Sequence, residues 1–154
     1  MPHSLEIVFV VAHVLAATVW VGGTVALTFI AVPAIRTLTG EPRQAAMRML
    51  GRRWRPIGWS ALLVLVATGI PLAAHVLPDA DTGAAAVFGV KIGAFLALLC
   101  FAYLHDFVLG PRLAAEIGEG RPQTSRRPLV LVGWASFTLT LALPILGVVL
   151  AEIV

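Results

Sequence analysis

The residues best suited to bind a ligand or transfer protons are ionisable side chains within long apolar runs. They are His13, His75, Lys91, His105 and Asp106. Because hydrocarbon penalises charged and strongly polar groups, such residues in a membrane segment mark functional sites by default. Imidazole binds copper, zinc and haem iron, and it exchanges protons near neutral pH. The sequence therefore predicts a metal-binding or proton-handling site, and the surrounding elements decide which of these residues can meet.

The runs around these residues are long enough to cross a membrane. The 154-residue chain is 59% hydrophobic and 12% charged, whereas soluble domains carry about 25% charged residues. A membrane helix needs about 20 consecutive apolar residues. We expect an all-α membrane protein with one domain over residues 1–154. Its four transmembrane helices would form an up-down bundle at about residues 5–35, 56–77, 86–109 and 128–153.

The arginines fall in two clusters, at residues 36–55 and 112–127, which follow the first and the third predicted helix. Clusters of positive charge beside membrane helices remain in the cytoplasm. We therefore expect a bacterial-type plasma-membrane protein with both Arg-rich loops cytoplasmic and both termini outside. Because the charge of +3 comes from these clusters, we expect the lipid bilayer, and no nucleic acid, as the partner.

The first Arg-rich loop has a pattern of its own. Met47, Leu50 and Trp54 recur at the spacing of one helix face, with arginines between them. This pattern fits a short amphipathic helix on the inner leaflet. It equally fits an inward extension of the second transmembrane helix.

The two halves of the chain share a spacing pattern. His13 stands twenty positions before Pro33, and Lys91 stands twenty positions before Pro111. The second helix of each half opens on a similar motif, Gly58-Trp59-Ser60-Ala61 in one and Gly133-Trp134-Ala135-Ser136 in the other. The pattern indicates a parallel internal repeat of two helical hairpins.

The depth of each ionisable residue follows from its distance to the nearest arginine cluster. His13, His75 and Lys91 lie roughly 30–34 Å from the arginines along their helices, whereas His105 lies only roughly 10 Å away. His13 and His75 are therefore the pair that could bind one metal ion near the outer face. Lys91 could bind an anionic group such as a haem propionate, and His105 and Asp106 form a separate inner-face polar pair.

Other roles for these residues remain open. His13 could make a purely structural hydrogen bond between helices, and His75 could be a solvated interface residue. Lys91 could extend its amine to the membrane surface. The inner pair could be an ordinary polar contact or a relay for protons or ions.

Several short motifs carry a resemblance to a known family. These are Ala12-His13-Val14-Leu15-Ala16-Ala17, Trp20-Val21-Gly22-Gly23, Val90-Lys91-Ile92-Gly93 and His105-Asp106-Phe107-Val108-Leu109-Gly110-Pro111-Arg112. Together they resemble the CopD domain, a membrane module associated with copper resistance and uptake, over essentially the whole chain. The resemblance implies copper handling in the plasma membrane.

A weaker similarity points to a different cofactor. The arrangement of His13 and Lys91 is similar to HemJ, a membrane protoporphyrinogen oxidase that binds haem b, in which they would match two functional positions. The similarity implies a haem b electron-transfer protein or oxidoreductase, so the cofactor is copper or haem b and enzyme activity is undecided. The apolar helices also fit an accessory subunit without a cofactor, bound to another membrane protein, or a homo-oligomer.

Overall fold

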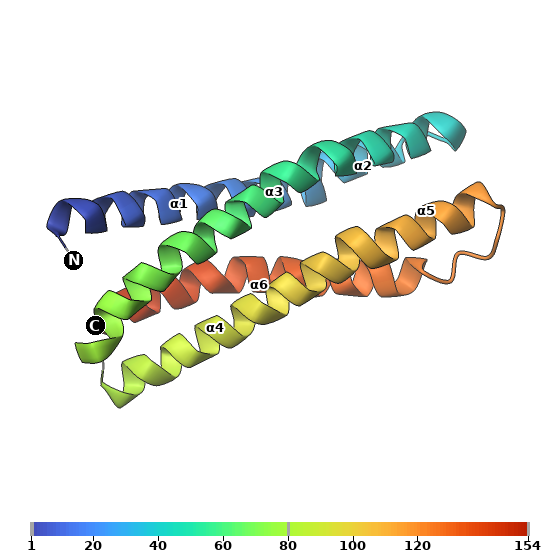
Figure 1. Cartoon of the computed structure of the whole chain (residues 1–154). Coiled ribbons are helices and arrows are strands. Elements are labelled where there is room, and N and C mark those ends of the chain that lie inside the picture. Colours follow the sequence, from blue (N-terminus) through green and yellow to red (C-terminus); the bar gives the residue numbers. More distant parts are fainter. Residues whose placement is uncertain (1, 80, 154) are drawn as a thin grey trace. The chain divides into compact units, whose positions relative to one another are not determined.

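The structure is a computed structural model that describes residues 2–79 and 81–153. Across these residues the chain is almost entirely helical and has no strand. The chain divides into two compact units, Met1–Ala80 and Asp81–Val154, each of which is a hairpin of antiparallel helices (Figure 1). The all-α fold class predicted from the sequence is confirmed.

The first unit contains one long helical arm on each side of a short turn. Its elements are α1 (His3–Ala26), the π-helical segment η1 (Leu27–Ala31), α2 (Val32–Arg36), α3 (Gly40–Val76) and the 3₁₀ turn η2 (Leu77–Asp79). The chain reverses between α2 and α3 at Gly40, whose φ of +60° is a conformation that favours glycine. The α1 and α3 helices then pack along each other.

The second unit repeats this plan. Its elements are α4 (Thr82–Tyr103), the π-helical segment η3 (Leu104–Leu109), α5 (Gly110–Gly118) and α6 (Arg126–Ile153). The carboxylate of Asp81 begins α4 by accepting a 2.7 Å hydrogen bond from the Ala84 backbone N–H, which is the role of a helix N-cap. The α4 and α6 helices pack along each other as α1 and α3 do.

Both π-helical segments end just before a proline. Pro33 follows η1 and Pro111 follows η3, and a phenylalanine stands four positions before each, at Phe29 and Phe107. Proline has no N–H to donate to the residue four positions back, and its ring crowds that carbonyl group. A π turn accommodates such an interruption without ending the helix. The sequence repeat therefore corresponds to a repeated backbone feature.

Four helical segments are long and apolar enough to cross a membrane, at His3–Arg36, Gly40–His75, Thr82–Gly118 and Arg126–Ile153. Many large apolar side chains on them are exposed, among them Ile30, Leu63, Leu131 and Ile145, each between 64% and 70%. In a soluble protein such surface would drive aggregation, whereas lipid tails solvate it. The chain is a multi-pass membrane protein.

The predicted helix limits need correction at the arginine-rich ends. The Arg-rich loop predicted at residues 36–55 is mostly helix, because α3 begins at Gly40, and only residues 37–39 connect it to α2. Likewise, the predicted loop at 112–127 shrinks to residues 119–125. Arginine is a good helix former, so the helices continue beyond the points where the apolar runs end. Of the two alternatives for residues 47–54, the structure has the inward extension of the second helix.

Candidate functional site

His13 lies on α1 and faces α3. Its Nδ1 atom is 2.8 Å from the Thr68 hydroxyl oxygen, which also lies 2.7 Å from the Val64 carbonyl oxygen. A hydroxyl has a single hydrogen to donate. When Thr68 donates it to Val64, the hydroxyl oxygen accepts the hydrogen of His13 Nδ1–H. This arrangement places the imidazole lone pair on Nε2, the atom through which a neutral histidine binds a metal ion.

A glycine on α3 makes the space that the His13 ring occupies. A Cβ atom on Gly69 would lie 3.3 Å from His13 Cε1, closer than side chains normally approach. Gly69 directly follows Thr68, so one residue supplies the hydrogen bond and the next one supplies the room. The local sequence of α3 therefore fixes the position of His13.

His75 takes part in a second cluster at the end of the same unit. Its Nε2 atom is 3.8 Å from Glu6 Oε2, and His3 Nδ1 is 3.9 Å from the same oxygen. The side chains of His75 and Glu6 are 42% and 36% exposed, and that of His3 is 87% exposed. Glu6 is thus a carboxylate placed between two accessible imidazoles.

The structure does not bring His13 and His75 together. Thr68, which bonds His13, precedes His75 by seven residues on α3, a rise of about 10 Å. Glu6, which His75 approaches, precedes His13 by the same number of residues on α1. The two imidazoles therefore lie on successive levels of the hairpin, and their role as joint ligands of one metal ion stays a prediction.

Lys91 occupies the matching position in the second unit. A Cβ atom on Gly147 of α6 would lie 3.3 Å from Lys91 Nζ. Gly147 follows Lys91 by as many positions as Gly69 follows His13. Each unit therefore packs its ionisable residue against a glycine of the opposite helix. Because Lys91 and His13 belong to different units, the role of Lys91 as a charge partner stays a prediction.

His105 and Asp106 lie in the π-helical segment η3. His105 Nδ1 is 3.0 Å from the carboxylate oxygen Oδ1 of Asp106. The other edge of the ring faces α6, where a Cβ atom on Gly133 would lie 3.5 Å from His105 Nε2. The two side chains therefore contact each other, and the carboxylate can hold His105 with the hydrogen on Nδ1. The role of the pair at the inner face stays a prediction.

The cluster around Glu6 is what the sequence analysis missed. In the described part of the chain, no group of three His, Cys, Asp or Glu residues is close enough to hold a metal ion as it stands. The group that comes nearest to such an arrangement consists of Glu6, His3 and His75. The signal available in the sequence was the spacing of His3 and Glu6, which places them on one face of a helix.

Comparison with known proteins assigns the chain to a family. Residues 48–151 match the family described as copper resistance protein D, CopD, and the chain belongs to that family. The matched segment includes His75, Lys91 and His105, whereas Glu6 and His13 precede it. No curated protein and no solved structure matches the chain. The match supports a role in copper resistance and lends no support to HemJ similarity or to haem b.

Proposed function

We propose that the protein handles copper in the plasma membrane, and that His3, Glu6 and His75 first bind the ion. Two findings support the proposal, namely membership of the CopD family and the approach of two imidazoles to one carboxylate. The choice of His3, Glu6 and His75 rests on the second finding, the approach of the two imidazoles to the Glu6 carboxylate. Copper is here the cargo of the protein.

The donor atoms favour Cu²⁺ over Cu⁺. The cluster offers imidazole nitrogen and carboxylate oxygen, which suit Cu²⁺, whereas Cu⁺ prefers the sulfur of cysteine and methionine. Met47 and Met49 lie near the opposite end of α3. An N/O site at the outer surface would therefore take copper in its oxidised form.

The spacing of the donors is compatible with a shared ion. Histidine and carboxylate ligands of a first-row ion such as Zn²⁺ lie about 2.0–2.2 Å from it, so two ligands of one ion are separated by about 3–4 Å. The separations from Glu6 to each histidine are 3.8 and 3.9 Å. Because both histidine side chains are exposed, we propose that they rotate toward the ion when it binds.

His13 is the next nitrogen ligand along the hairpin. It lies about 10 Å further from the His75 end of the unit, given the helical rise. Its Nε2 lone pair is set by the bond to Thr68. We propose that His13 receives the ion after the first cluster. We place His3, Glu6 and His75 at the outer face because the arginine-rich segment at the other end of α1 and α3 is expected to face the cytoplasm.

The proposal is tested by expressing the full chain in bacteria and measuring growth and copper content at graded copper concentrations. We expect expression to change both quantities, and the double variant Glu6→Gln/His75→Ala to abolish the change. The control is Glu41→Gln/Glu152→Gln, which removes two exposed carboxylates that lie outside the cluster. A control variant that fails equally, or a double variant that works normally, would overturn the proposal.

A further inference from the structure

The connection between α5 and α6 is held in one conformation by a buried carboxylate. Glu116 is 8% exposed, and its carboxylate accepts hydrogen bonds from the Thr124 hydroxyl at 2.7 Å, the Ser125 hydroxyl at 2.9 Å and the Ser125 N–H at 3.1 Å. The Arg121 N–H also donates to the Glu116 carbonyl oxygen, at 2.8 Å. The connection is therefore an ordered loop whose backbone is held in place by these hydrogen bonds, and its side chains project from that fixed backbone.

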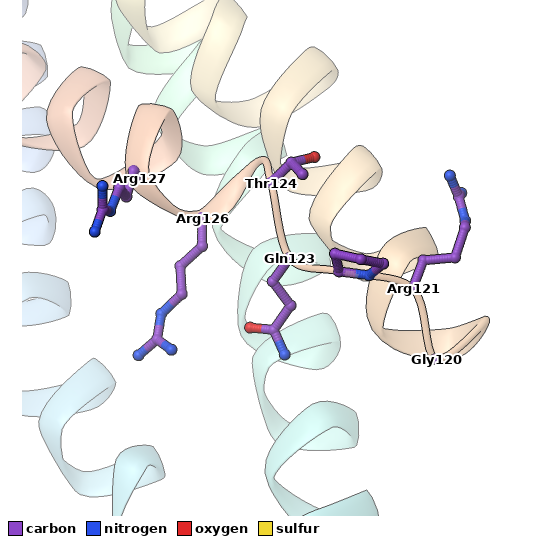
Figure 2. A pocket seen from close by; sticks show the side chains of 7 residues that line it. Gly120, Arg121, Gln123, Thr124, Arg126 and Arg127 are labelled. Atoms are coloured by element: carbon purple, nitrogen blue, oxygen red, sulfur yellow. The ribbon is translucent and has the colours of Figure 1, made fainter.

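This loop surrounds a shallow hollow of about 780 Å³ with a basic lining (Figure 2). The lining residues are Gly120, Arg121, Pro122, Gln123, Thr124, Arg126 and Arg127, and none of them is acidic. Figure 2 shows that Arg126 and Gln123 extend to the same side of the loop, whereas Arg121 points away from them. Arg121 is paired with the carboxylate of Glu119.

Arg126 and Arg127 have no such partner. Within residues 2–79 and 81–153, neither guanidinium makes an ion pair or a side-chain hydrogen bond. A guanidinium group presents paired N–H donors that match the oxygens of a phosphate group. The amide of Gln123 adds two further donors beside Arg126.

The position of the hollow along α6 identifies the source of the phosphate. The span Arg126–Ile153 has 28 residues, which corresponds to about 42 Å of helix. A bilayer with its headgroups is about 40–45 Å thick. The first residues of α6 therefore lie at the level of the headgroups when the helix spans the membrane.

We propose that Arg126, Arg127 and Gln123 bind the phosphate of an anionic phospholipid from the surrounding leaflet. The loop fixed by Glu116 holds the start of α6, and the two arginines hold the lipid against it. The proposal is independent of copper binding, because it uses residues of the second unit alone and a different chemistry.

The test is native mass spectrometry of the full chain in a mild detergent, titrated with phosphatidylglycerol or with phosphatidylcholine of the same acyl chains. We expect phosphatidylglycerol to bind preferentially, and Arg126→Gln/Arg127→Gln to weaken its binding about tenfold or more, since two favourable charge contacts are lost. The matched control is Arg52→Gln/Arg53→Gln, two exposed arginines on α3 that lie outside the hollow.

Three results would overturn the proposal. Equal binding of the two lipids would show that the hollow does not prefer a net anionic headgroup. Equal losses in the two double variants would show that the effect depends only on the net charge of the protein. Displacement of phosphatidylglycerol by glycerol 3-phosphate or inorganic phosphate at matching concentrations would assign the hollow to a soluble anion. The variant Arg126→Lys/Arg127→Lys keeps the charge, and its intermediate affinity would support paired donation by the guanidinium groups.

Discussion

His13 is held by two neighbouring residues of α3, one of which bonds its ring while the other makes room for it. Both contacts are made at one level of the hairpin, and donation from His13 Nδ1–H to Thr68 would place the imidazole lone pair on Nε2. The sequence predicted His13 as a candidate because it is a titratable residue within an apolar run. It could not predict Thr68 as the partner, because that contact depends on how α1 and α3 align.

Gly69→Ala tests this arrangement at the residue scale. The added Cβ would lie 3.3 Å from the His13 ring, so the ring must move by a few tenths of an ångström and its bond to Thr68 lengthens. We expect a loss of about 1 kcal/mol of unfolding free energy, the order of one hydrogen bond between membrane helices. Reversible unfolding in mixed micelles measures this change in unfolding free energy.

Gly51→Ala is the control on the same helix, because no atom lies within 4 Å of the added Cβ. It should be stabilising by about 0.5–1 kcal/mol through helix propensity alone. If Gly69→Ala stabilises the protein as much as Gly51→Ala does, the proposed constraint on His13 is wrong.

At the scale of the elements, α1 and α3 are joined by aromatic packing on glycine. The rings of Trp20 and Trp54 lie 6.1 Å apart between centroids, and the Trp54 ring occupies the space beside Gly23 where a Cβ would stand. Trp20 is itself only 7% exposed. These contacts anchor the N-terminal half of α3 to α1 just before Pro56.

Gly23→Ala should therefore separate the helices or displace the Trp54 ring. We expect a destabilisation of about 1–3 kcal/mol, which is typical of overpacking at a close contact. The neighbouring variant Gly22→Ala places its Cβ in open space and, like Gly51→Ala, should stabilise the protein by about 0.5–1 kcal/mol through helix propensity. Thermal unfolding, monitored by Trp fluorescence, compares the two variants. Similar unfolding midpoints for both would contradict the packing of Trp54 against Gly23.

Hydropathy was enough to predict four helices and their order, because each apolar run exceeds the length of a membrane helix. It placed the helix ends wrongly in the arginine clusters, since a helix can leave the membrane without ending. The π-helical segments before Pro33 and Pro111 were not predicted either. Their prolines were noted as part of the repeat, but proline alone does not distinguish a kink from a π turn.

At the scale of the whole molecule, the repeat places similar features in two hairpins. Each hairpin has an ionisable residue on its first helix, a glycine opposite it, and a π turn before a proline. The repeated polar residue differs, however, because a histidine in one unit corresponds to a lysine in the other. Among the described residues, only those of the first unit place a carboxylate between two imidazoles, which is why the proposed copper site lies in that unit.

The predicted topology is tested by thiol labelling of intact and permeabilised cells. In a Cys100→Ala background, single cysteines at Ser4 and Glu152 should react with an impermeant maleimide in intact cells. Cysteines at Leu38 and Gln123, which lie in the connections beside the arginines, should react only after permeabilisation. The opposite labelling pattern would contradict the positive-inside orientation.

The most direct test of the central proposal is to titrate the purified full chain with Cu²⁺ and to monitor binding by electron paramagnetic resonance. We predict one Cu²⁺ with nitrogen and oxygen ligands, lost in Glu6→Gln/His75→Ala and retained in the control variant Glu41→Gln/Glu152→Gln. If both double variants bind Cu²⁺ like the unaltered protein, or if the unaltered protein binds none, then the cluster of His3, Glu6 and His75 is not the copper site.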